Sequence, residues 1–273
     1  MGKTVTYGIE YARTDPALEG FKFYMNRYKS LVNNSKPLLA FETILELTEW
    51  LVDESDDEVG DSPKFNSCLQ GAITMCRQCL KSIQPPEFLP RAYAALSQAH
   101  LLLHDFQAAI EYGLKTIEHP LDKQLLQTAY RTMGNIYFTK SSDPEKSRFS
   151  DFSNALHYYQ LERSVIDQMK DDEEDKVKQR LIQSSYFNMG VMQSKLSDHH
   201  SESEGNLRMA IQMAQQLNDA VSERTAWWEL SNLFKRSGHY ELVKECQENE
   251  YQLIQQHGFT DDALYCFEEQ SNK

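Results

Sequence analysis

The stretch "TAWWELSNLFKRSGHY" at residues 225–240 decides the fold, because it sets two adjacent tryptophans inside a repeating apolar pattern. Neighbouring residues on a helix point about 100° apart, so Trp227 and Trp228 cannot both enter one core. After Trp227, the apolar or small residues Leu230, Ser231 and Phe234 follow at the third, fourth and seventh positions. This spacing favours an amphipathic helix with Trp227 on its buried side.

The same pattern occurs three more times upstream, as "YAALSQAH" (93–100), "YRTMGNIY" (130–137) and "YFNMGVMQ" (186–193). Each stretch starts with a large aromatic residue, continues with Leu or Met three residues later, and then has Ser or Gly. The pattern W-x2-L-G-x2-Y marks the first helix of a tetratricopeptide repeat. We therefore predict an all-α fold, a tetratricopeptide-repeat right-handed superhelix of antiparallel helix pairs. Such pairs stack because none can bury its apolar face alone.

The second helix of each pair is expected to supply a small or apolar residue of its own, with Ala109, Ala155 and Val243 at that place. The aromatic positions are 37, 56 and 41 residues apart, whereas the ideal repeat has about 34. We assign part of the excess to an inserted surface loop at 140–150, "KSSDPEKSRFS", and part to the acidic stretch at 170–177.

These patterns divide the chain into four parts. Three helices without the repeat signature are expected at 17–33, 38–52 and 64–83. A last short helix is expected after Gly258, either as a cap for the stack or as the start of a further repeat. The parts are an N-terminal tail (1–16), degenerate helical repeats forming an N-terminal cap (17–90), about four tetratricopeptide repeats (91–259), and a C-terminal capping helix and tail (260–273).

The composition is that of an ordinary globular protein with a strong negative charge. Hydrophobic residues make up 40% and charged residues 25%, and the formal net charge is −13. Direct nucleic-acid binding needs a basic stripe, which the sequence lacks. No apolar run reaches the length of a membrane span, and the N-terminus has no apolar secretory segment. Gly2 and Thr6 fit the permissive N-myristoylation pattern, but one acyl chain binds membranes only marginally.

The sequence offers no catalytic or metal-binding constellation. Phosphate-loop, nucleophile-elbow and zinc-protease motifs do not occur. Of the five cysteines, Cys76 and Cys79 form a C-x-x-C inside a helical pattern, which we interpret as two buried, reduced thiols. The adjacent His199 and His200 are expected in a solvated turn. We therefore predict a non-enzymatic protein with no catalytic residue, no metal and no cofactor.

The repeat register predicts a partner-binding surface on the concave side of the stack. It combines aromatic and cationic residues, which dominate binding hot spots, and it suits a peptide with acidic and apolar residues. In the alternative interpretation, Phe187 and Trp228 only pack between neighbouring repeats. The predicted surface residues are Arg131, Asn135, Phe138, Phe187, Asn188, Lys195, Trp228, Asn232, Lys235 and Arg236.

Part of this surface is similar to the clamp with which chaperone-binding repeats hold a C-terminal carboxylate. Arg131, Asn135 and Asn188 match part of that clamp. Thr225 and Glu229 stand where it needs cations, and a glutamate repels a carboxylate. The sequence therefore argues against binding of a chaperone tail.

From residue 122 to about 256 the chain resembles the N-terminal repeat region of the Tonsoku (tonsoku-like) family. The resemblance lies in "LLQTAYRTMGNIYF", the insertion, "ALHYYQLERSVIDQ", "SSYFNMGVMQSKL" and "ERTAWWELSNLFKRSGHYE", in that order. It implies a nuclear protein of replication-fork-associated DNA repair, whose repeats form a scaffold for a large fork-repair partner. That family also has an ankyrin section, which reads histone tails, and a separate section of leucine-rich repeats. This sequence has neither, so the resemblance supports the scaffold role in repair at chromatin and leaves histone reading open.

Three hypotheses follow. The first is a nuclear scaffold in repair of DNA damage at replication forks. The second is a cytoplasmic or cortical adaptor of the same architecture, which binds a peptide of a motor, polarity or chaperone partner. The third is an enzyme without recognisable motifs, or an acylated regulator at a membrane.

Overall fold

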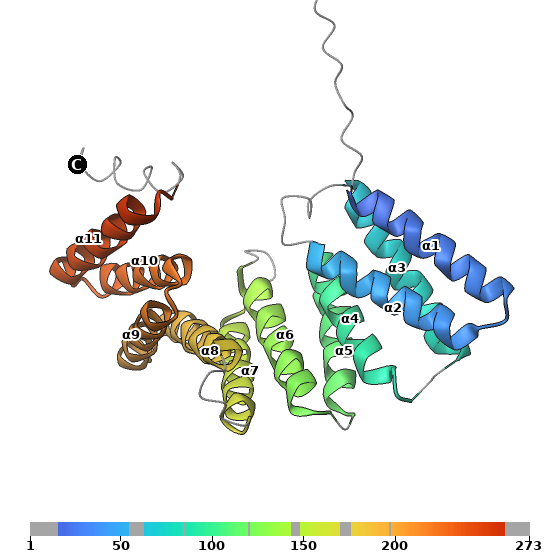
Figure 1. The fold of residues 1–273 in the computed structure, drawn as a ribbon. Coiled ribbons are helices and arrows are strands. Elements are labelled where there is room, and N and C mark those ends of the chain that lie inside the picture. The colour runs from blue at the N-terminus through green and yellow to red at the C-terminus, as the bar shows by residue number, and fades with distance from the viewer. Residues whose placement is uncertain are drawn as a thin grey trace, which may run out of the picture. The chain divides into compact units, whose positions relative to one another are not determined.

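The computed structural model describes residues 16–54, 63–83, 86–119, 121–142, 148–169, 176–196 and 198–259. Within these ranges the chain forms eleven α-helices and no strand (Figure 1). It divides after His119 into two compact units. Unit 1 contains α1 to α5 and unit 2 contains α6 to α11.

Unit 1 consists of α1 (Pro16–Asn33), α2 (Pro37–Asp53), α3 (Pro63–Ser82), α4 (Leu89–Leu102) and α5 (Phe106–Ile117). The first three helices agree with the predicted ranges to within one residue at each end. A proline begins each of them, at a position where its missing N–H costs no helical hydrogen bond.

The buried core of unit 1 extends past residue 90 into the first of the predicted repeats. Leu96 and its neighbours on α4 lie in the same buried cluster as Phe41 of α2 and Leu69 of α3. The first helix pair that carries the repeat signature, α4 with α5, therefore belongs with the N-terminal helices. Sequence periodicity could not show this, because the shared core joins residues far apart along the chain.

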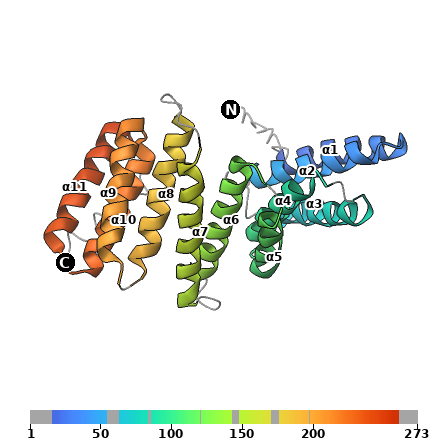
Figure 2. The same ribbon diagram turned by 90° about the horizontal axis from the view of Figure 1, so that it is seen from below.

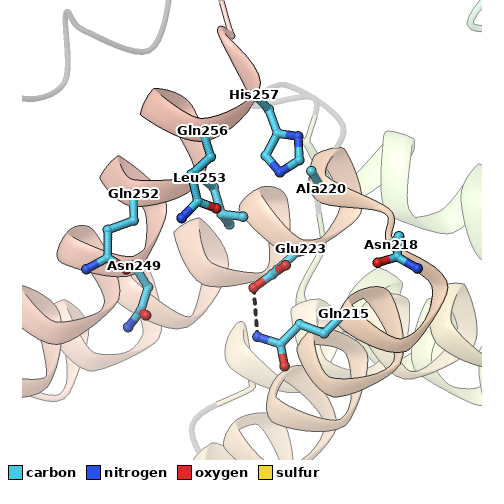
Figure 3. A pocket seen from close by; sticks show the side chains of 9 residues that line it. All are labelled: Gln215, Asn218, Ala220, Glu223, Asn249, Gln252, Leu253, Gln256 and His257. Carbon is cyan, nitrogen blue, oxygen red and sulfur yellow. Dashed lines mark hydrogen bonds between the residues drawn. The ribbon is translucent and has the colours of Figure 1, made fainter.

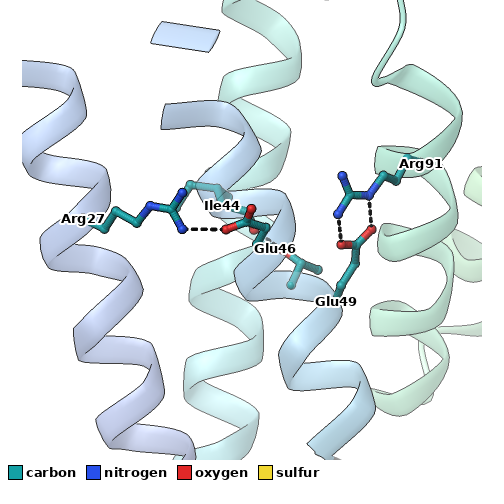
Figure 4. Close-up of polar contacts among 6 residues, drawn as sticks. Arg27, Ile44, Glu46, Glu49 and Arg91 are labelled. Carbon is teal, nitrogen blue, oxygen red and sulfur yellow. Dashed lines mark hydrogen bonds and ion pairs between the residues drawn. The ribbon is translucent and has the colours of Figure 1, made fainter. Parts of the chain in front are cut away.

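Two charged contacts across helices supplement this core (Figure 4). Arg27 on α1 donates to Glu46 on α2 at 2.8 Å. Arg91 on α4 makes two hydrogen bonds, of 2.6 and 2.5 Å, to the two carboxylate oxygens of Glu49 on α2. Because these side chains are partly exposed, each pair contributes only modest stability.

The two cysteines of the C-x-x-C lie buried on α3. Burial raises the pKa of the Cys76 thiol to about 12 and also raises the pKa of Cys79. Thiolate chemistry is therefore disfavoured at both residues, in agreement with their prediction as core side chains.

Unit 2 is a row of three helix pairs in which each helix packs against the next (Figure 2). Tyr159, Leu207 and Leu230 belong to its continuous buried core. The helices are α6 (Lys123–Ser142), α7 (Phe149–Asp167), α8 (Lys176–Ser194), α9 (His200–Leu217), α10 (Ala220–Arg236) and α11 (Tyr240–His257).

The insertion predicted at 140–150 falls between two long helices, and its residues 143–147 lie outside the described part of the chain. Helix α6 continues to Ser142 and α7 begins at Phe149, so both ends of that segment are helical. Lys140 of α6 lies 2.9 Å from the buried carboxylate of Asp151, the residue that follows this segment on α7. The extra length of this repeat thus goes largely into longer helices.

Close approach between paired helices confirms the role of the small residues. A Cβ atom on Gly134 would lie 2.5 Å from the Tyr159 ring, and one on Gly190 would lie 2.8 Å from Cγ of Leu207. Both distances are shorter than carbon atoms tolerate. The all-α fold of tetratricopeptide-like helix pairs is therefore confirmed. The predicted tail (1–16) lies outside the described residues except for Pro16, which begins α1, and so do the Gly2 pattern and the capping helix (260–273).

Candidate partner-binding site

A pocket of about 290 Å³ lies in unit 2 across the first helices of three successive pairs. We call this surface the inner groove. Four predicted surface residues line it, Thr225 stands at a position where the carboxylate clamp needs a cation, and the other four lining residues were not predicted. The lining residues are Arg131 and Asn135 of α6, Gln183, Ser184, Phe187 and Asn188 of α8, and Val221, Ser222 and Thr225 of α10.

Arg131 is held in place by a buried carboxylate on the neighbouring helix. Its Nε donates to Oε1 of Glu162 on α7 at 2.7 Å, and Nε2 of Gln127 donates to the same oxygen at 2.6 Å. Burial raises the pKa of Glu162, whereas the charge of Arg131 and these two hydrogen bonds act in the opposite direction. The Arg131 side chain remains 29% exposed. It therefore presents an oriented guanidinium to the inner groove.

Asn135 is oriented by a second buried contact. The hydroxyl of Tyr159, which is only 1% exposed, donates to Oδ1 of Asn135 at 2.8 Å. Burial raises the pKa of Tyr159, so its hydroxyl stays protonated and can donate. Because the amide oxygen of Asn135 is engaged, its NH2 group is left to face a ligand. Helix α6 thus offers hydrogen-bond donors to the groove.

Helix α10 offers acceptors and apolar surface. Ser222 donates its hydroxyl hydrogen to Asp219, and Thr225 donates its own to the carbonyl of Val221. Their oxygens retain lone pairs that can accept. Val221 is 63% exposed, and Phe187 on α8 is half-buried. Donors on α6, acceptors on α10 and the apolar side chains of Phe187 and Val221 can match the alternating groups of an extended peptide.

The other six predicted residues lie outside this pocket. Phe138 and Trp228 are 36% and 44% exposed, and each stands one helical turn beyond a pocket residue of its own helix. Asn232 is half-buried further along α10. Lys195 follows the end of α8, and Lys235 and Arg236 occupy the last turn of α10, all three exposed.

The two tryptophans separate as the helix geometry requires. Trp227 is half-buried against the core of unit 2, and its Nε1 donates to Oε1 of Glu223 at 3.3 Å. Trp228 is exposed over 44% of its surface, on the helix stripe that also contains Val221 and Thr225. Trp227 is therefore structural, and Trp228 extends the exposed apolar surface beyond the groove.

Glu229 lies one turn beyond Thr225 and changes the local electrostatics. Burial raises its pKa, and the positive charges of Lys195 and Arg236 act against that rise. Its Oε2 is buried without a hydrogen-bond partner among the described residues. The carboxylate of a ligand would be repelled by Glu229 at this position. This agrees with the sequence argument against a chaperone-type clamp.

The sequence contains a pattern that places the α10 residues of the groove on one helix face. Val221, Thr225 and Trp228 follow one another at helical spacing of four and three residues. The predicted surface follows the repeat register forward from the aromatic residue Trp227, and Val221 and Ser222 lie in the turns before it. Gln183 and Ser184 on α8 precede the aromatic Tyr186 in the same way.

Metal sites and membrane spans are both absent from the described ranges, 16–54, 63–83, 86–119, 121–142, 148–169, 176–196 and 198–259. No group of three or more His, Cys, Asp or Glu side chains there is arranged to hold a metal ion. Within the same ranges, no helix combines the length and the apolar character that a membrane span requires.

Comparison with known proteins identifies the fold. No family model matches the chain, and no curated protein sequence matches it. The crystal structure of BtubC (BKLC) from P. vanneervenii superposes with a TM-score of 0.62 at 13% sequence identity, over 90% of this chain and 94% of that one. The fold is a helical repeat.

A second similar structure is that of a protein with tetratricopeptide repeats. It is a signal transduction ATPase with numerous domains, with a tetratricopeptide repeat sensor, from Pyrococcus horikoshii. The TM-score is 0.51 at 18% identity, and the match covers 93% of this chain but 43% of that protein. Both similarities concern the fold alone. A helical-repeat fold of this kind is typical of protein-interaction scaffolds.

Proposed function

We propose that this chain is a non-enzymatic scaffold that holds an extended segment of a partner protein in the inner groove. The observation that carries the proposal is the groove itself, where buried Glu162 and Tyr159 orient Arg131 and Asn135 toward a ligand. Preorganised side chains lose less conformational freedom on binding, which favours affinity.

For the biological setting we propose replication-fork-associated DNA repair in the nucleus. The support is the resemblance of residues 122–256 to the repeat region of the Tonsoku family, in which this region assembles a large fork-repair partner. Histone contact is not part of the proposal. The alternative is a cytoplasmic or cortical adaptor for a motor, polarity or chaperone partner, since the same groove would serve any extended peptide.

Affinity purification from cells with quantitative mass spectrometry tests both the binding groove and the biological setting. The groove variant is Val221→Arg, which places a long charged side chain on an exposed groove position. The matched control is Met209→Arg on α9, where the side chain is also exposed but lines neither pocket described here.

We expect partners that bind the wild type and the Met209 variant to be lost from the Val221 variant. An unchanged partner set would contradict the groove as the binding site. Recovery of replication factors among the lost partners would support the repair setting. Recovery of motor or cortical proteins alone would reject that setting in favour of the adaptor.

A further inference from the structure

A second pocket in unit 2, of about 330 Å³, lies where α9 ends, α10 begins and the last turns of α11 pass (Figure 3). It shares no lining residue with the inner groove. We call it the amide pocket, because five of its nine lining residues carry carboxamides: Gln215, Asn218, Asn249, Gln252 and Gln256.

The amide pocket has a negative character. Glu223 is the sole Asp, Glu, Lys or Arg among its lining residues. The helices α9 and α11 end beside it, and helix C-termini carry partial negative charge. The positive N-terminus of α10 is offset by Asp219, whose side chain accepts from the backbone N–H of Ser222 at 3.1 Å.

One oxygen of Glu223 is occupied and the other is available. Its Oε1 accepts from Nε2 of Gln215 at 2.7 Å and from Nε1 of Trp227 at 3.3 Å (Figure 3 shows the first contact). Its Oε2 accepts no hydrogen bond from any described residue. The two contacts on Oε1 fix the carboxylate, so that Oε2 can pair with an incoming cation.

The α11 side of the pocket presents uncommitted amides. Gln252 and Gln256 are one helical turn apart, so they share a face of α11. Neither side chain makes a hydrogen bond within the described part of the chain. Carboxamides donate and accept without carrying charge, as the peptide backbone does.

We propose that the amide pocket binds an arginine side chain within an extended segment of a partner protein. The guanidinium pairs with Oε2 of Glu223, and its remaining N–H groups reach carboxamide oxygens. Gln252 and Gln256 hydrogen-bond the adjacent backbone. The net charge of −13 attracts a basic segment. The chain's own residues 260–273 contain four acidic residues and a single lysine, so they match the pocket poorly.

The test uses the full chain and two blocked pentapeptides, acetyl-Ala-Ala-Arg-Ala-Ala-amide and its citrulline analogue. Citrulline has nearly the shape of arginine without the charge. Nuclear magnetic resonance of the Asn and Gln side-chain amides, assigned by substitution of Gln252 and Gln256, reports binding in the pocket. Glu223→Gln removes the charge. Glu202→Gln is the matched control, because Glu202 also lies in the first turn of its helix, α9, and lines neither pocket.

We expect the arginine peptide to shift the amide signals of Gln252 and Gln256. Glu223→Gln should weaken this binding about tenfold, which corresponds to about 1.4 kcal/mol, and Glu202→Gln should leave it unchanged. Three outcomes would overturn the proposal: no binding at millimolar peptide, equal binding of the citrulline peptide, or shifts confined to Asn135 and Asn188 of the inner groove.

Discussion

Substitution of Gly134 by alanine tests the close packing of α6 on α7, which places Arg131 and Asn135. The added methyl group would lie 2.5 Å from the ring of Tyr159. That ring is 1% exposed and its hydroxyl is bonded to Asn135, so it has no free space into which to move. Overpacking of this kind costs about 1–3 kcal/mol. Alanine in a helix regains about 0.5–1 kcal/mol relative to glycine. We therefore expect a net destabilisation within about 0–2.5 kcal/mol, with about 1 kcal/mol as the central value.

Gly205→Ala is the matched control for this prediction. Gly205 lies exposed within α9, and no atom stands within 4 Å of the place its Cβ would take. We expect this variant to be more stable than the wild type by about 0.5–1 kcal/mol. Urea unfolding followed by circular dichroism should shift the midpoint down for Gly134→Ala and up for Gly205→Ala. If both variants gained stability equally, the close approach of α6 and α7 would be wrong.

Three further predictions concern His100, Glu162 and the tryptophan pair. Burial lowers the pKa of His100 below its usual value, because the folded protein disfavours the charged imidazole. The neutral form of His100 therefore contributes stability above about pH 6.5. This stability is lost as the pH falls through the lowered pKa. Urea midpoints should therefore drop more between pH 7.5 and 5.5 for the wild type than for His100→Phe, and equal drops would contradict this. Glu162→Ala leaves Arg131 without its buried partner and should cost about 3 kcal/mol in urea unfolding; a cost below about 1 kcal/mol would refute the role of the pair. Trp227→Ala should destabilise the protein by about 2 kcal/mol or more, whereas Trp228→Ala should change stability by less than about 0.5 kcal/mol and reduce partner recovery. The reverse order would make Trp228 the core residue.

The helices and their pairing could be predicted from the sequence because the repeat pattern is local. In each repeat, aromatic, Leu or Met and small residues follow one another within eight positions, and helix geometry places them on one face. Gly134 and Gly190 carried the clearest information, since each stands where a neighbouring helix leaves no space for a side chain.

The buried contacts that orient the groove residues could not be predicted, because they join distant parts of the chain. Glu162 is 31 residues from Arg131, and Tyr159 is 24 residues from Asn135. On its own helix Glu162 resembles any charged surface residue, and nothing local marks it as fully buried. The amide pocket was missed for a similar reason, because Asn and Gln form no motif that identifies a site.

The most direct test of the account is site-specific photo-crosslinking in the full chain, with benzoylphenylalanine placed at Val221 in the inner groove or at Met209 on α9. The copurified partner is crosslinked and the joined peptides are mapped by mass spectrometry. We expect crosslinks from position 221 to one short segment of the partner, and none from position 209. Crosslinks from position 209 with none from position 221 would contradict it.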